Sequence, residues 1–209
     1  MNENSYTNYA ELQQNEQEST DYRITVYHRN PDIAILAIHG GNIEPGTGEI
    51  AAAFGERLGA STYLFEGLKP SGNKVLHITS NFFNEPIGVS MAADSLTNLS
   101  IHGHCDVHNV LVYIGGRNET YKKLILHSLN EAGFQAEYAP QHLSGTNENN
   151  ITNICKTGAG VQLELSTKLR KSLFKDDDFT SKNRVNRSDL FHRFVRALEK
   201  ATLKYKQRE

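Results

Sequence analysis

The chain has 209 residues, 38% of them hydrophobic, which is enough for one good-sized core and marginal for two. Its longest strongly apolar stretch, residues 33–38, is far too short to cross a bilayer, so we expect no membrane partner. Cys105 and Cys155 allow at most one bridge, which excludes a disulfide framework and a zinc site built from cysteines alone. The polar, acidic first 20 residues do not resemble a secretory signal, so we expect synthesis in a cytoplasm.

Charge is distributed unevenly along the chain. Residues 1–150 hold 8 Lys and Arg against 17 Asp and Glu, whereas residues 151–209 hold 14 against 7. A basic final quarter suits a polyanionic partner, either a nucleic acid or an acidic polymer. An amphipathic helix with a solvated basic face explains the same pattern equally well.

The hydrophobic pattern predicts strands alternating with helices. In chain order we expect strands at 22–26 and 33–38, a helix at 48–58 with Thr47 as its N-cap, strands at 62–66, 75–79, 96–101 and 110–114, a helix at 118–132, a strand at 161–165 and a helix at 190–205. The run at 33–38 is apolar throughout, as in a strand buried on both faces of a parallel sheet. We therefore expect an α/β fold with a mixed, mostly parallel sheet flanked by helices. Residues 1–21 are expected to be a polar lead-in and residues 22–209 a single domain.

The loop after the buried strand is the first candidate functional segment. The strand runs into His39, two glycines permit a tight turn, and Glu44 follows five residues after the histidine. Ligands of open α/β sheets gather at the carboxyl ends of strands, and an imidazole with a carboxylate forms a sensible half of a zinc site. A turn with an incidental histidine is the simpler alternative. The His-Gly-Gly pattern also occurs in serine hydrolases, but the Gly-x-Ser-x-Gly motif that they require is absent.

A second short apolar strand also ends at a histidine. His102 matches His39 in placement, and we choose it as the third ligand, because catalytic zinc commonly takes three protein ligands. His104 is the competing choice, since it points to the same side if the strand continues. Cys105, Asp106 and His108 follow, and we expect them to support the site or to lie on the surface.

Glu164 is the candidate general base. It lies between Leu163 and Leu165 in a strand pattern, where a carboxylate is costly to bury unless it is paired or functional. The alternative is that strand alternation places Glu164 on a solvated face together with Gln162. Desolvation near the site would raise the pKa of Glu164, whereas a zinc ion would oppose that shift.

These segments together resemble a known family. The sequences HGGNIEPGT, SIHGH, YIGGRN and GVQLELSTKLR are similar to those of the bacteriophage poly-γ-glutamate hydrolases, and the likeness runs from Tyr22 to the C-terminus. That family in turn resembles zinc carboxypeptidases in architecture. The spacing of the first ligand pair departs from theirs, because four residues separate His39 from Glu44 and not two. Substrate-binding residues of the carboxypeptidases are therefore not carried over.

The resemblance implies hydrolysis of the γ-amide bonds of poly-γ-glutamate with one Zn²⁺ per chain. His39, Glu44 and His102 would hold the zinc, and Glu164 would accept a proton from the attacking water. Because the polymer carries a free carboxylate on every residue, Arg117 and Arg170 are candidate substrate contacts. We expect a monomer that is released by host lysis and acts outside the cell.

Two other functions are compatible with parts of the sequence. Peptidoglycan amidases use similar zinc ligands, although they often carry a separate wall-binding module. A nucleic-acid-binding protein would account for the basic final quarter, but the chain has no helix-turn-helix, zinc-finger spacing or aromatic platform, so we expect no nucleic-acid partner. The sequence indicates neither endo- nor exo-cleavage, nor a preference between D- and L-glutamate.

Overall fold

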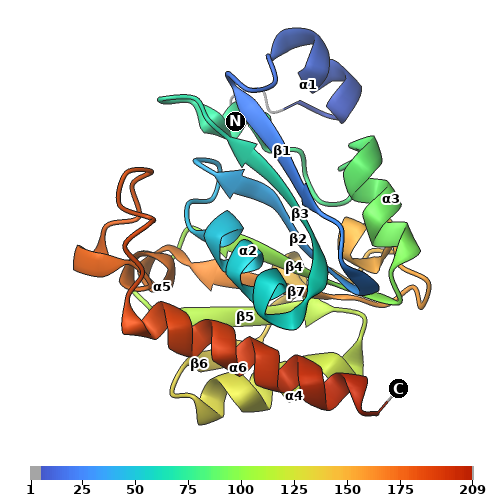
Figure 1. Cartoon of the computed structure of the whole chain (residues 1–209), viewed down its shortest axis with the longest axis vertical. Coiled ribbons are helices and arrows are strands. Elements are labelled where there is room, and N and C mark those ends of the chain that lie inside the picture. The colour runs from blue at the N-terminus through green and yellow to red at the C-terminus, as the bar shows by residue number, and fades with distance from the viewer. Residues whose placement is uncertain (1–5, 209) are drawn as a thin grey trace.

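A seven-stranded sheet organises the chain in the computed structural model, which describes residues 6–208 (Figure 1). The strands are β1 (Tyr22–Tyr27), β2 (Asn30–Gly41), β3 (Ala60–Gly67), β4 (Thr97–His104), β5 (Leu111–Gly116), β6 (Gln135–Tyr138) and β7 (Val161–Ser166). The α-helices are α1 (Tyr9–Asn15), α2 (Thr47–Leu58), α3 (Pro86–Asp94), α4 (Glu119–Glu131), α5 (Thr167–Ser172) and α6 (Asp189–Lys206). Four short 3₁₀ helices complete the description: η1 (Asn73–Leu76), η2 (Gln141–Leu143), η3 (Ile151–Asn153) and η4 (Lys175–Asp177).

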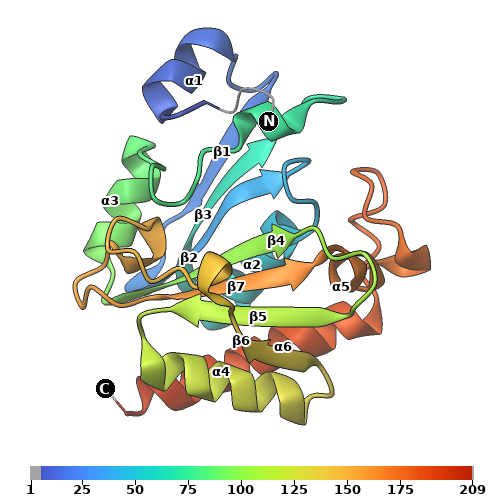
Figure 2. The same ribbon diagram turned by 180° about the vertical axis from the view of Figure 1, so that it is seen from behind.

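The sheet is mixed and mostly parallel, which confirms the predicted fold class. Its strand order is β1-β3-β2-β4-β7-β5-β6. The pairs β3–β2, β2–β4, β4–β7 and β5–β6 are parallel, whereas β1–β3 and β5–β7 are antiparallel. In Figure 2 the arrows of β4 and β7 accordingly point the same way and that of β5 points back. The carboxyl ends of β2, β4 and β7 therefore meet at one edge of the sheet.

Both faces of the interior strand β2 are buried, as its continuous apolar sequence predicts. Ile33, Ile35 and Ala37 face a large core formed with α2, α4 and α6, while Leu36 and Ile38 face a smaller core on the other side. α1, α3 and the segment around η1 contribute to that smaller core through Leu12, Met91, Leu76 and their neighbours. Helices thus cover both sides of the sheet (Figures 1 and 2).

A β-bulge near the end of β2 changes which way its side chains point. Ala37 pairs with Leu64 and Gly40 with Glu66, so β2 holds one residue more than β3 over this interval. Simple alternation would turn His39 towards the α2 side, together with Ile35 and Ala37. The extra residue reverses that alternation, as bulges do, and His39 lies instead on the side of the smaller core, against the Ile78 carbonyl.

The predicted strand at 75–79 is wrong. Residues 73–76 form η1, in which Val75 N donates to Gly72 O, and His77 N donates to Lys74 O. These local bonds use donors that a strand would give to a neighbour, while Leu76 and Ile78 cover the smaller core. The sequence also did not predict α3, α5 and β6. The first helical residue of α2 is Thr47 and its N-cap is Gly46, one position earlier than predicted.

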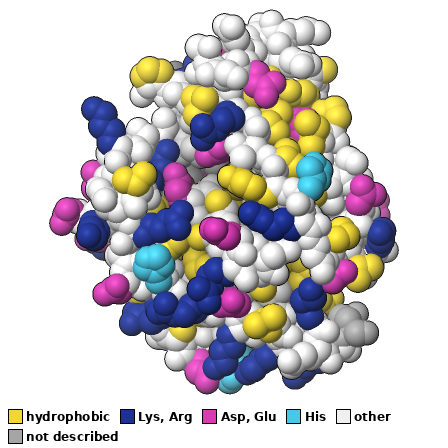
Figure 3. Space-filling model, viewed as in Figure 1, with side chains coloured by type: hydrophobic (Ala, Val, Ile, Leu, Met, Phe, Trp, Pro, Cys, Tyr) yellow, Lys and Arg dark blue, Asp and Glu magenta, His cyan; other side chains and the backbone are white. Residues whose placement is uncertain are grey.

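Two expectations about the ends of the chain can be compared with the structure. The polar lead-in contains α1, whose Tyr9 and Leu12 are buried, and residues 1–5 lie outside the described part. The basic C-terminal quarter ends in α6, which has phenylalanines inside and exposed Arg193, Arg196 and Lys200 outside, and Figure 3 shows Lys and Arg side chains gathered over this region. Within residues 6–208, no helix has both the length and the apolar character to span a bilayer. Cys105 and Cys155 are both free thiols.

Candidate metal centre

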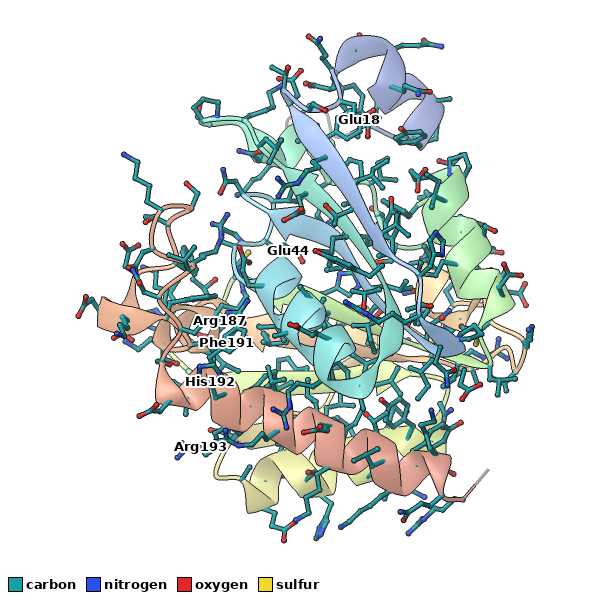
Figure 4. The ribbon with its side chains drawn as sticks, viewed as in Figure 1. Glu18, Glu44, Arg187, Phe191, His192 and Arg193 are labelled. Atoms are coloured by element: carbon teal, nitrogen blue, oxygen red, sulfur yellow. The ribbon has the colours of Figure 1, made fainter. Side chains whose placement is uncertain are left out.

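The loop after β2 brings Glu44 back over the strand end. Gly41 has a positive φ of 64°, and a Cβ there would lie 2.4 Å from the Gly67 carbonyl oxygen, so only glycine fits. The Thr47 hydroxyl donates to the Glu44 carbonyl at 2.9 Å, and the Gly103 amide donates to Glu44 Oε2 at 2.8 Å. Glu44 therefore lies between the end of β2 and the start of α2, where it is labelled in Figure 4, and it reaches β4.

Three of the candidate ligands converge. His39 Nδ1 lies 3.2 Å from Glu44 Oε1 and 3.2 Å from His102 Nδ1. His102 Nδ1 lies 3.8 Å from Glu44 Oε2. His39 and His102 are each 2% exposed, so their ring nitrogens meet Glu44 in a region shielded from water.

Hydrogen bonding fixes the tautomer of His39. Its Nε2 lies 2.8 Å from the Ile78 carbonyl oxygen, which can only accept, so Nε2 carries the hydrogen and Nδ1 a lone pair. Burial lowers the pKa of His39 to about 4, so the ring is neutral at pH 7. The lone pair of Nδ1 then faces the Glu44 carboxylate at contact distance, which is unfavourable unless a cation or a proton lies between them. This arrangement fits a metal ion, and the Ile78 contact is the kind that orients a ligating histidine.

The pKa values of Glu44 and His102 are shifted by the same contacts. Burial alone would raise the pKa of Glu44, but contacts with His39, His102 and His77 outweigh it and hold that pKa well below its usual value. Burial would lower the pKa of His102, but the Glu44 hydrogen bond and the Glu164 charge outweigh it and raise that pKa. The Glu44 carboxylate is therefore ionised, and the raised pKa of His102 favours a proton on that ring, which a bound metal would displace.

His77 is a site residue that the sequence analysis missed. Its Nε2 lies 3.4 Å from Glu44 Oε1, and its ring stacks on that of His39 with centroids 3.8 Å apart. One ligand atom each from His39, Glu44 and His77 lie within 4.8 Å of one another, so this trio is also able to hold a metal. The available signal was a lone histidine between apolar residues in the 75–79 segment, which was interpreted as a strand and not as a loop that borders the site.

Glu164 lies beside the converging ligands. It pairs in register with His102 on β4 and with Tyr113 on β5, and it is 9% exposed, so the alternative of a solvated face is wrong. The Gln162 amide donates to Glu164 Oε1 at 3.3 Å and to the Leu143 carbonyl at 3.0 Å. Burial raises the pKa of Glu164 to about 7, the range expected of a general base at neutral pH.

Of the other residues after His102, two line the site and two do not. His104 and Cys105 border the cavity described below, and His104 packs near Tyr113 with ring centroids 5.3 Å apart. Asp106 is partly buried and accepts from the His108 and Asn109 backbone amides, which closes the turn after β4. His108 is exposed.

The two candidate substrate arginines are placed differently from expectation. Arg117 is exposed and follows Gly116, which pairs with Val161 at the start of β7, whereas Glu164 lies near the end of that strand. Arg170 is 5% exposed, and its guanidinium donates to backbone carbonyls. Neither arginine lines the cavity.

A cavity of about 700 Å³ opens onto the converging ligands. Besides the histidines and carboxylates described above, its wall consists largely of hydroxyl and amide side chains from residues 79–81, from Gln162 and from the segment 141–150, which we call the wall loop. In the part of the chain that the structure describes, no Lys or Arg lines this cavity. The cavity therefore suits a polar ligand that is held by neutral hydrogen-bond donors.

An α/β sheet with His and Glu side chains converging at its carboxyl edge, beside a buried glutamate, defines a protein with a candidate hydrolytic metal centre. The chain belongs to the poly-gamma-glutamate hydrolase family, whose model matches residues 6–197. This membership confirms the resemblance stated from the sequence.

Relatives and solved structures agree with the family assignment. The chain is 38% identical over 199 residues to the protein YndL of Bacillus subtilis (strain 168), covering 94% of this chain and 77% of YndL. It is 36% identical over 197 residues to YoqZ of the same organism, a SPbeta prophage-derived protein, covering 93% and 70%. A structure of a bacteriophage poly-gamma-glutamate hydrolase superposes with a TM-score of 0.97 at 37% identity, covering 99% of this chain and all of that one. A zinc-free structure of YndL superposes with a TM-score of 0.90 at 37% identity, covering 97% and 99%.

A more distant structure shares the fold. An N-formylglutamate amidohydrolase from Ralstonia eutropha JMP134 superposes with a TM-score of 0.56 at 11% identity, covering 90% of this chain and 98% of that chain. At that identity the likeness concerns the fold alone.

Proposed function

We propose that the chain is a zinc-dependent hydrolase that cleaves the γ-amide bonds of poly-γ-glutamate. The family assignment supports the substrate class and the hydrolytic reaction. The observation that carries the metal dependence is the buried convergence of three potential donor atoms, His39 Nδ1, a Glu44 carboxylate oxygen and His102 Nδ1. The description of the YndL structure as zinc-free supports zinc as the metal.

His39, Glu44 and His102 are the proposed zinc ligands, and three protein ligands leave a position open for chemistry. Zinc bound there would act as a Lewis acid on the amide carbonyl and bring the pKa of coordinated water to about 7. The neutral His39 ring and the ionised Glu44 are already in the protonation states that ligands need. His77, half exposed on the cavity side, is the competing third ligand.

Glu164 is the proposed general base. It accepts a proton from the attacking water and returns the proton to the leaving amine. Its pKa of about 7 suits both steps at neutral pH, and the Gln162 amide holds Oε1 so that Oε2 is left for proton transfer. Neutral donors of the wall loop that line the cavity, such as Thr146 and Asn147, would bind the carboxylates that flank the reacting amide.

The test combines metal analysis with a depolymerisation assay. We expect about one zinc per chain, loss of polymer cleavage on chelation and recovery when zinc is returned. Glu164→Gln should fold, keep its zinc and lose roughly 10²–10⁴-fold in kcat, as expected when a general base is removed. Polymer length is followed by size-exclusion chromatography.

Two results would contradict the proposal. Full activity of a chelated, metal-free preparation would exclude the zinc mechanism. Clearing of bacterial cell walls without shortening of poly-γ-glutamate would indicate a peptidoglycan amidase instead.

The phage origin stated for two relatives supports a further part of the proposal, that the chain meets its polymer outside the host after lysis.

A further inference from the structure

Arg170 is a buried charge placed behind the candidate metal centre. It lies in α5, directly after β7, and is 5% exposed. Burying a guanidinium is costly unless its N–H groups find partners. Its Nε donates to the Leu165 carbonyl at 3.2 Å, one terminal nitrogen donates to the Pro45 carbonyl at 2.9 Å, and the other donates to the His104 carbonyl at 3.4 Å and the Thr167 hydroxyl at 3.2 Å.

The three carbonyls belong to the three segments that carry the site. Pro45 directly follows Glu44, His104 is two residues beyond His102, and Leu165 directly follows Glu164. A planar guanidinium presents its donors in a fixed fork, so bonds to three carbonyls fix three pieces of backbone relative to one another.

Close packing of Gly103 against Arg170 supports the same conclusion. A Cβ at position 103 would lie 2.5 Å from the Arg170 Cζ atom and 2.5 Å from its Nε. Glycine at this position therefore lets the guanidinium lie directly against the β4 backbone, next to His102. The Gly103 amide meanwhile donates to Glu44 Oε2, so the same residue contacts both Arg170 and the carboxylate.

The loop that carries Glu44 depends on Arg170 for its position more than β4 and β7 do. β4 and β7 are paired in register as far as His104 and Ser166, so the sheet itself holds His102 beside Glu164. Residues 42–46 lie beyond the end of β2, and the bond from Asn42 N to the Gly67 carbonyl joins the start of this segment to β3. The Arg170 bond to the Pro45 carbonyl joins this loop to the ends of β4 and β7.

We propose that Arg170 is a positioning residue that holds the Glu44 loop against the strand ends bearing His102 and Glu164, so that the metal ligands keep their mutual geometry. The inference rests on the proposed zinc site and replaces a substrate contact with a scaffold role. Arg170 does not touch substrate in this role. Its loss should therefore weaken metal binding, while substrate binding stays unchanged once the metal is bound.

Arg170→Lys and Arg170→Met test the proposal. Lysine keeps the positive charge but presents a single ammonium that cannot reach three carbonyls in the same plane. We expect both variants to bind zinc about 10–100-fold more weakly, the range for changes behind a metal ligand, as measured by competition with a chelator. The visible spectrum of Co²⁺ bound in place of zinc should also change, since it reports ligand geometry. KM for the polymer should stay near the wild-type value once zinc is saturating.

Asn98→Ala is the matched control. Asn98 is also buried and polar, and it donates to the Ala92, Ile151 and Ile154 carbonyls at the opposite end of β4. Its loss should lower the melting temperature while leaving zinc affinity and the Co²⁺ spectrum unchanged. If the Arg170 variants do not fold, Gly103→Ala carries the same test, because the added methyl displaces the guanidinium in an otherwise intact chain.

Two outcomes would overturn the inference. Wild-type zinc affinity in folded Arg170 variants, with only a lower melting temperature as in Asn98→Ala, would reduce Arg170 to a stabilising residue. An increased KM with unchanged zinc affinity would make it a substrate contact. Failure of the proposed function is a separate result, since wild-type protein would then bind no zinc or leave the polymer intact.

Discussion

His102 and His77 both place a ring nitrogen within reach of Glu44, but from different kinds of backbone. His102 is fixed in β4 and 2% exposed, whereas His77 follows η1, with 38% of its side chain exposed. We therefore expect His102→Ala to lose zinc and His77→Ala to keep it with reduced activity. Zinc content after dialysis measures this directly. The opposite pattern would make His77 the third ligand, and loss in both variants would indicate a four-ligand site.

Glu164 gives the metal-free protein a distinctive pH dependence. Its folded pKa is about 7, above the ordinary 4.5, so the folded state holds a proton between these pH values that the unfolded state has lost. Stability contributed by this group is thus full below about pH 4.5 and falls as pH rises through 7. We expect chelated wild-type protein to lose about 2 kcal/mol more than Glu164→Gln between pH 5 and 8. Urea unfolding at both pH values measures the difference, and parallel pH profiles would contradict the prediction.

The sequence shows which chemical groups are present, but the burial and contacts of each residue decide which role it takes. His39 and Glu44 were chosen as candidates because a buried strand running into a glycine turn is visible in the sequence, and the structure brings their side chains together. Arg170 was interpreted as a substrate contact because arginine binds carboxylates, and nothing in the sequence shows that three backbone carbonyls surround it. His77 was missed because its approach to Glu44 depends on the path of an irregular segment.

At the scale of elements, Gly145 of the wall loop packs directly against Gln162 of β7. Gly145 has a φ of 60°, and a Cβ there would lie 2.3 Å from the Gln162 side-chain carbon that bears its amide. Gly145→Ala should displace Gln162 and with it the hydrogen bond to Glu164, lowering kcat by about 10-fold, at the lower end of what a misplaced catalytic group costs. Zinc content should not change. Steady-state kinetics on the polymer provides the measurement.

Gly158→Ala is the control for that experiment. Gly158 has a φ of 65°, and a Cβ there meets nothing within 4 Å. The substitution therefore imposes similar backbone strain without a collision, and we expect a small loss of stability, about 1 kcal/mol, with normal kcat. Equal losses of kcat in the two variants would show that strain, and not the displaced Gln162, lowers activity.

A strand that is buried on both faces was predictable from the sequence, whereas elements that depend on tertiary contacts were not. The apolar run of β2 has a single interpretation, because both of its faces are buried. The 75–79 segment has the same alternation as a strand, yet it covers the smaller core from outside the sheet. The bulge that turns His39 also has no local signal, because it shows only in the pairing of β2 with β3.

At the scale of the whole molecule, the large core that stabilises the fold lies apart from the candidate site. α6 packs on the large core, on the side of the sheet away from His39 and Glu164. Leu198→Ala, at a fully buried position of α6, should cost about 2–5 kcal/mol and lower the melting temperature by roughly 5–15 °C. Zinc content and kcat/KM at 25 °C should remain normal. Leu203→Ala, 49% exposed on the same helix, is the control and should change the melting temperature little.

The strand that carries His102 has a consequence for how the chain folds. β4 is paired on one side with β2, from Ile33 and Thr97 onwards, and on the other with β7, from Leu99 and Val161 onwards. Each of these contacts closes a long stretch of chain, and such closures slow folding because their entropy is lost before the contacts are gained. The proposed zinc ligands, on β2, in the loop after it and on β4, therefore come together only after β2 and β4 have paired. Zinc would then bind the finished sheet far better than its precursors, and by mass action would favour chains whose central strands are already in register.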